Sequence, residues 1–86
     1  MSIENIKNKI EQAIPNAQAY VLDPMNDGQH LQAFVISKSF ENVMLVKQHQ
    51  MVMKPLKEAM ATSVHALGLK TFTPEKWSES KGQFGF

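Results

Sequence analysis

The 86-residue chain contains no cysteine. This absence excludes a disulfide framework and also excludes a metal site built on the chain's own thiolates. It is typical of proteins from a reducing compartment. Any chemistry that needs a soft metal or an iron-sulfur cluster would therefore require sulfur ligands from another molecule.

Arginine is also absent, since all nine basic residues are lysine, and with eight acidic residues the formal net charge is only +1. A chain with so little net charge produces no strong field that gathers phosphates. Without the planar guanidinium fork it lacks the side chain that most often reads guanine or grips phosphate. Strong general affinity for nucleic acid is therefore not expected.

Long apolar runs are missing as well. The N-terminus alternates isoleucine with charged and amide residues and never reaches the length of a signal peptide or membrane span. We therefore expect a cytoplasmic protein with no membrane segment. A chain of this size forms one small domain that buries only about 60% of its unfolded surface, which leaves little room for an internal active site.

Sequence patterns of common enzymes are not found. No nucleophile elbow, no HExxH pair and no glycine-rich phosphate loop after a strand occurs in the chain. We therefore expect a protein that is not an enzyme.

The hydrophobic pattern predicts five main elements. Isoleucines at helical spacing predict a first helix that Ser2 caps and Pro15 ends. Residues 17–22 and 30–37 are predicted as strands of a hairpin around the turn DPMNDG. A long helix over residues 44–61 is expected to kink or break at Pro55, and residues 64–72 form a third strand.

This order predicts an α/β (α+β) fold with a K-homology-like topology. We expect a three-stranded mixed sheet with two main helices packed on one face, in the order α-β-β-α-β, and then a short C-terminal turn that Thr73 caps. The second and third strands are joined by a helix, so as neighbours they run parallel. The domain is expected to span residues 1–77, with residues 78–86 as a flexible tail.

Two histidines stand at the starts of these two strands. Neighbouring parallel strands begin at the same end of a sheet and lie about 4.8 Å apart, so His30 and His65 are expected to approach a common metal ion. Each alone is weak support, because a histidine at a strand end is more often solvated or capping. His49 lies within the apolar arc of the long helix, and we interpret it as a packed, hydrogen-bonded core residue.

Residues 64–77, VHALGLKTFTPEKW, resemble the most recognisable motif of the BolA-like proteins, an HAL, LKT and TPxxW pattern. Residues 30–56 more loosely resemble the family's strand, connector and second helix, and the likeness runs from the first helix to Trp77. Asn42 stands at the connector position where the family usually has glycine, and asparagine tolerates positive φ better than most residues.

The resemblance implies a partner and a cofactor. BolA-like proteins pair with monothiol glutaredoxins and share a [2Fe-2S] cluster with them in iron-sulfur trafficking or iron sensing, with glutathione supplied through the partner. By this resemblance His65 is a cluster ligand and His30 is the candidate second ligand. Alone, the chain is expected to carry no cofactor and to be a monomer or a weak homodimer.

Two other functions remain open from the sequence. Some members of the family are transcription regulators, and a patch of Lys47, Lys54, Lys57 and Lys70 could bind DNA or RNA. The glycine-rich GXXG clamp of K-homology domains is absent, which weakens that alternative. The third possibility is a stable scaffold whose histidines only cap strands.

Overall fold

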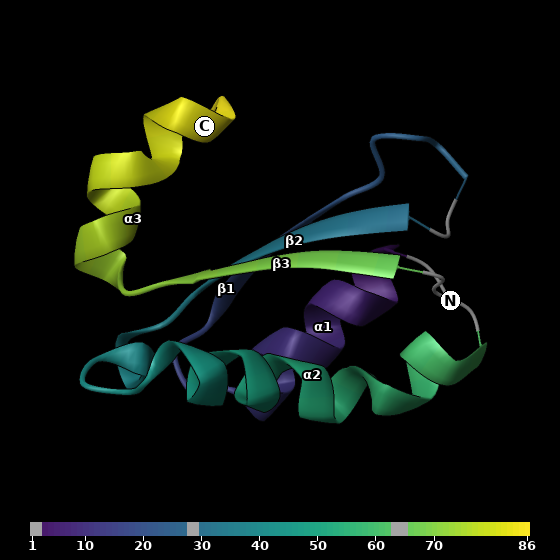
Figure 1. Cartoon of the computed structure of the whole chain (residues 1–86), viewed down its shortest axis with the longest axis horizontal. Coiled ribbons are helices and arrows are strands. Elements are labelled where there is room, and N and C mark those ends of the chain that lie inside the picture. The colour runs from purple at the N-terminus through teal and green to yellow at the C-terminus, as the bar shows by residue number, and fades with distance from the viewer. Residues whose placement is uncertain (1–2, 28–29, 63–65) are drawn as a thin grey trace.

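The computed structural model describes residues 3–27, 30–62 and 66–86 of the chain. Figure 1 shows a sheet with helices on both of its faces. The elements in chain order are α1 (Ile3–Ala13), β1 (Gln18–Leu22), β2 (His30–Ile36), the 3-10 turn η1 (Lys38–Phe40), α2 (Leu45–Thr62), β3 (Ala66–Phe72), α3 (Pro74–Ser80) and η2 (Lys81–Phe84). The predicted α+β class and element order are confirmed. None of the helices in these ranges is long and apolar enough to cross a membrane.

The sheet has the order β1-β2-β3, with β2 in the centre. β1 and β2 form an antiparallel hairpin, in which Gln18 lies opposite Ile36. β2 and β3 run parallel, and their register places His30 opposite Ala66 at one end and Ile36 opposite Phe72 at the other. The predicted parallel pairing through the α2 crossover is therefore confirmed.

The main core lies between the sheet and the helices α1 and α2, which cover one face as expected (Figure 1). α1 presents Ile6 and Ile10 at helical spacing, Ile14 follows directly after the helix, and alternate residues of β1 and β2 point toward them. The buried members of this core are Ile6, Ile10, Ile14, Ala19, Val21, Leu31, Ala33, Val35, Phe40, Val52 and Leu56.

A second, smaller core occupies the opposite face of the sheet. Phe34 and Ile36 are buried there because the side chains of β2 alternate between the two faces. Trp77 of α3 covers them, with its ring centroid 6.0 Å from that of Phe34 and 5.2 Å from that of Phe72. β2 is thus buried on both faces along its C-terminal half.

The structure differs from the sequence-based expectation for residues 78–86. α3 extends to Ser80 and is followed by η2, so the segment predicted as a flexible tail is helical over most of its length. The Phe84 ring lies 5.0 Å from that of Phe34, and the Phe86 ring lies 4.9 Å from that of Tyr20. These two phenylalanines pack on aromatic rings of the second face, and burial of the rings stabilises the helical conformation of the segment. The polar, glycine-containing composition of the segment does not predict this packing.

The long helix α2 continues through Pro55, so the predicted break does not occur. Proline removes one backbone hydrogen bond there, but Val52 and Leu56 on either side are fully buried in the main core. Packing of this face maintains the helix. Ahead of α2, Asn42 adopts a positive φ of 62°, as expected for a residue at a glycine position.

Gln48 fastens the start of α2 to its surroundings. Its Nε2 donates hydrogen bonds to the carbonyl oxygens of Phe40 and Val43, at 3.3 and 2.8 Å. Its Oε1 accepts one from Oγ1 of Thr71 at 2.7 Å, which links α2 to β3. The first turns of α2 are therefore held in a fixed position beside the end of β3.

At the other edge of the sheet, α1 contributes a carboxylate to β1. Oε2 of Glu11 accepts a hydrogen bond from the backbone N–H of Ala19 at 3.1 Å. This N–H belongs to an edge strand and faces away from β2, so no neighbouring strand can accept its hydrogen bond. The Glu11 carboxylate accepts it instead.

We expect the Phe84→Ala substitution to lower the free energy of unfolding by about 1–2 kcal/mol, because a half-buried aromatic ring leaves the second core. Urea denaturation followed by circular dichroism measures this change. The exposed neighbour Gln83 provides the control, and Gln83→Ala should change the free energy by less than about 0.5 kcal/mol. Equal stability of the two variants would contradict the packing of η2 on the sheet.

Candidate functional site

His30 is the first residue of β2 and lies at the end of the sheet opposite to α3. Its backbone position in the central strand is fixed by pairing with β3. The side chain is 42% exposed, so the imidazole can reach a ligand or partner at the surface. His30 therefore lies at the end of β2 and is accessible at the surface.

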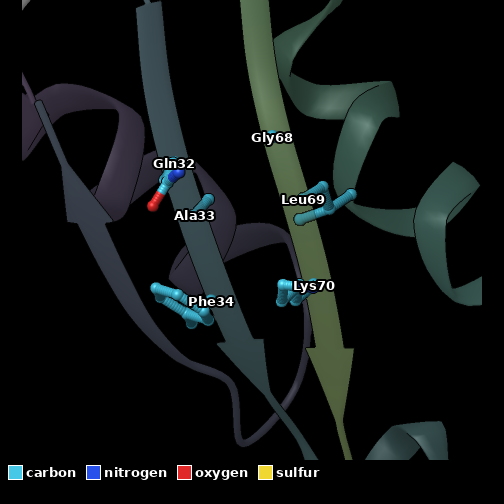
Figure 2. Close-up of a pocket in the computed structure, with 6 residues that line it drawn as sticks. All are labelled: Gln32, Ala33, Phe34, Gly68, Leu69 and Lys70. Carbon is cyan, nitrogen blue, oxygen red and sulfur yellow. The ribbon is translucent and has the colours of Figure 1, made fainter. Parts of the chain in front are cut away.

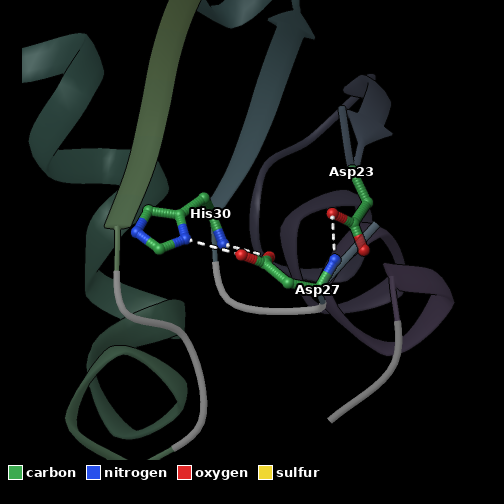
Figure 3. Close-up of polar contacts among 3 residues, drawn as sticks. All are labelled: Asp23, Asp27 and His30. Atoms are coloured by element: carbon green, nitrogen blue, oxygen red, sulfur yellow. Dashed lines mark hydrogen bonds and ion pairs between the residues drawn. The ribbon is translucent and has the colours of Figure 1, made fainter. Parts of the chain in front are cut away.

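The turn before β2 holds the imidazole through a chain of hydrogen bonds (Figure 3). Nδ1 of His30 lies 2.8 Å from Oδ2 of Asp27, and the backbone N–H of His30 donates to Oδ1 of the same carboxylate at 3.0 Å. The backbone N–H of Asp27 in turn donates to Oδ1 of Asp23 at 3.2 Å. Asn26, with a φ of 54°, closes the turn by donating its N–H to the carbonyl oxygen of Asp23.

This pairing determines which nitrogen of a neutral imidazole carries the proton. A ring that donates its Nδ1 proton to Asp27 carries its lone pair on Nε2. Ligating histidines in metalloproteins commonly donate their other N–H to a carboxylate in this way, which orients the ring and makes it a better ligand. The Asp27–His30 pair has this chemistry.

His65 lies outside the described residues. It directly precedes Ala66, the residue that pairs with His30 across β2 and β3. Among the residues that the structure describes, no group of three or more histidine, cysteine, aspartate or glutamate side chains could hold a metal ion.

Comparison with known proteins identifies the family. The family model described as "BolA-like protein" matches residues 3–76. The chain belongs to the BolA-like family. It is 31% identical to the "Acid stress protein IbaG" of Escherichia coli K12 over 81 residues, which cover 92% of this chain and 96% of that protein.

Two further similarities place this BolA-like chain among its relatives. It is 40% identical over 48 residues to the "DNA-binding transcriptional regulator BolA" of Haemophilus influenzae, which is 56% of this chain and 47% of that protein. A solved structure of a BolA homologue from Coxiella burnetii has a TM-score of 0.76 and 29% identity, and the match covers 91% of this chain and 97% of that chain. Both the family and its fold are therefore established here, as the resemblance implied.

His49 differs from its expected role. It is half-buried, is not a member of either core, and its ring makes no hydrogen bond within the described ranges. It instead lines a groove between α2 and the C-terminal helices, with Leu45 one turn earlier. The buried face of α2 is centred on Val52 and Leu56, and His49 lies at the margin of that face where sequence periodicity alone cannot separate core from rim.

The four predicted nucleic-acid-binding lysines do not form one patch. Lys47, Lys54 and Lys57 are exposed along one side of α2. Lys70 is exposed on the opposite face of the sheet, with its Nζ 5.7 Å from the centroid of the Phe84 ring. The sheet separates it from the lysines of α2.

Beside Lys70 the sheet carries a shallow hollow of about 200 Å³ over the middle of β2 and β3 (Figure 2). A Cβ at Gly68 would meet Cγ of Gln32 at 3.7 Å, which is an ordinary van der Waals contact. Its lining residues are Gln32, Ala33, Phe34, Gly68, Leu69 and Lys70.

Asp27 is a site residue that was not predicted from the sequence. A sequence signal was present, because aspartate three residues before a histidine in a turn can bond both its backbone and its ring. The turn residues were interpreted only as a loop between strands. The structure adds Asp27 to the candidate site as the residue that orients His30.

We expect Asp27→Ala to change the tautomer of the neutral His30 ring, because the carboxylate that accepts the Nδ1 proton is lost. Nitrogen chemical shifts from long-range proton-nitrogen NMR spectra distinguish the two tautomers. Glu41→Ala, which removes an exposed carboxylate elsewhere, is the control. An unchanged His30 tautomer in Asp27→Ala would show that the carboxylate does not orient the ring.

Proposed function

We propose that this BolA-like chain is a non-enzymatic adaptor that shares a [2Fe-2S] cluster with a monothiol glutaredoxin, in iron-sulfur trafficking or iron-dependent regulation. His30 and His65 supply the imidazole ligands, and the partner with its glutathione supplies sulfur. The observation that carries the proposal is the parallel register of β2 and β3, in which His30 lies opposite the residue that follows His65.

The donor chemistry supports this division of ligands. An iron of a [2Fe-2S] cluster accepts two imidazoles in place of two thiolates, while the other iron keeps its sulfur ligands. The chain has three histidines and no cysteine, so it can contribute only the nitrogen half of such a set. Asp27 holds the ring of His30 by its Nδ1, which directs Nε2 to an incoming metal.

Co-expression with a monothiol glutaredoxin tests the shared cluster. The purified complex is expected to show the visible absorption and circular dichroism of a [2Fe-2S] centre. His65→Ala should abolish the features that are specific to the complex, and His30→Ala should reduce them, because each removes one nitrogen ligand.

His49→Ala is the matched histidine control, since its side chain lies in a groove beside α3 and η2 and not at the His30 end of the sheet. It should leave the cluster spectrum unchanged. A cluster spectrum of the complex that is indifferent to His65→Ala would rule out the ligand assignment.

A second function is favoured by the lysines of α2 and by one relative. Lys47, Lys54 and Lys57 lie on one exposed side of the helix, as a helix that contacts phosphates would require. The Haemophilus influenzae relative is named a DNA-binding transcriptional regulator. A role in binding DNA or RNA is therefore the alternative proposal.

Gel-shift titration of a DNA duplex at several salt concentrations tests this alternative. Binding through three lysines should weaken steeply with salt, with a log-log slope of about −3, because each neutralised phosphate releases a counterion. The triple variant Lys47→Gln, Lys54→Gln, Lys57→Gln should lose most of the affinity, and Lys81→Gln, in η2 on the opposite face of the sheet from α2, should not. Absence of binding at low salt would remove the alternative.

A further inference from the structure

The outer edge of β3 presents backbone groups that the sheet does not use. The carbonyl oxygen of Phe72 accepts the N–H of Ser37, which continues β2, so the backbone groups of Phe72 face β2. These groups alternate in direction along a strand, and therefore those of Leu69 and Thr71 face away from β2. Within the described part of the chain β3 pairs with β2 alone.

Nothing crosses in front of this edge in Figure 1, where β3 is the strand nearest the viewer, between α2 below and the C-terminal helices above. The backbone groups of Leu69 and Thr71 have no hydrogen-bond partner in the described ranges. An open strand edge of this kind is a template for an additional strand.

A groove of about 410 Å³ runs along the same edge. Leu45 and His49 of α2 form one wall, and the C-terminal segment with Phe84 forms the other. The floor is β3 itself. Its lining residues are Leu45, His49, Leu69, Lys70, Thr71, Phe72, Ser80, Gln83 and Phe84.

Three consecutive apolar side chains are exposed at the start of α2, and one of them, Leu45, lines the groove. Leu45 is 60% exposed, and its neighbours Met44 and Val46 in the chain are also exposed. Gln48 fixes this part of α2 against β3, so the apolar wall has a defined position. Contiguous exposed apolar side chains beside a free strand edge are typical of a site that receives a peptide.

The charge of the groove indicates the kind of peptide. Lys70 lines it, Lys76 lines the adjoining hollow at the end of β3, and no aspartate or glutamate lines either. Two copies of this edge would bring like charges together, which disfavours pairing of the chain with itself. An acidic segment would instead be attracted.

We propose that the β3 edge is a docking site for an extended, acidic segment of another protein. The segment adds to the sheet as a fourth strand through hydrogen bonds with Leu69 and Thr71. It places an apolar side chain between Leu45 and Phe84 and a carboxylate near Lys70. This site uses the backbone of β3 and is independent of the ligand role proposed for His30 and His65.

Selection from a phage-displayed library of random octapeptides on the folded full-length chain provides the probe. We expect the selected peptides to combine acidic residues with a large apolar residue. A synthetic copy of the best peptide should then slow the hydrogen exchange of the Leu69 and Thr71 amides by about tenfold or more. The Lys70 amide, which already faces β2, should change little, and this alternation is the signature of strand addition.

Two pairs of variants test the geometry. Leu45→Glu should weaken binding of the peptide about tenfold, because it places a carboxylate in the groove, whereas Val46→Glu adds the same charge to the same helical turn outside the groove lining and should change the affinity less than about twofold. Thr71→Pro removes the outward N–H, and Thr71→Val keeps it. Both lose the hydroxyl bonded to Gln48, so the loss of this hydrogen bond cancels in the comparison. Thr71→Pro should bind the peptide more weakly than Thr71→Val, and circular dichroism of the two free variants shows whether the fixed φ of proline has disturbed the fold.

Several results would overturn the proposal. One is a library that yields no binder, and another is selection of basic or uncharged peptides. Bound peptide that protects Lys70 as much as Thr71 would also exclude strand addition. Concentration-dependent dimerisation that protects the same amides without peptide would assign the edge to a second copy, and competition by a single-stranded oligonucleotide would assign it to nucleic acid.

Discussion

The parallel pairing of β2 with β3 is the constraint on which the rest of the structure depends. A parallel pair needs a long crossover, and α2 provides it while covering one face of the sheet. The register of this pair decides which residues meet at each end. At the start of the strands, the register places His30 opposite Ala66. At their ends it places Phe72 of β3 next to β2, on the same face as Phe34. A shift of one residue would turn every side chain of β3 to the wrong face.

Hydrophobic periodicity predicted most of this arrangement. The isoleucines of α1 and the alternating residues of β2 indicate their elements directly, and helical connection of the last two strands implies their parallel direction. Pro55 was expected to kink or break α2. The helix does not break there, because burial of Val52 and Leu56 overrides the local preference, and local propensity does not include this energy of packing.

The candidate sites were harder to predict, because each depends on contacts between separate elements. The Asp27 carboxylate acts on His30 through the shape of a turn, which composition does not show. The position of His49 depends on where the C-terminal helices lie, and Phe84 belongs to a segment whose sequence looks polar. Lys70 was predicted to share one nucleic-acid-binding patch with the lysines of α2. The alternation of side chains along β3 instead places Lys70 on the face of the sheet opposite to α2.

The small net charge of the chain conceals an uneven distribution. The Asp27 carboxylate contacts His30 at the start of β2, and Asp23 in turn contacts Asp27. At the other end of β3, each of two hollows is lined by one lysine and, among the described residues, by no aspartate or glutamate. An acidic turn suits a site that orients an imidazole toward a cation, and the basic end suits an anionic partner. The two sites that we propose thus lie at different places on one small sheet and call for partners of different charge.

The Glu11 carboxylate on β1 has a consequence for assembly. A strand that paired with β1 would have to displace the Glu11 carboxylate from the N–H of Ala19. Among the described residues, no carboxylate is bonded to the outer edge of β3 in this way. Addition of a strand beside Ala19 would therefore cost this hydrogen bond. The two outer edges of the sheet are thus unequal, and the edge of β3 is the one more open to an added strand.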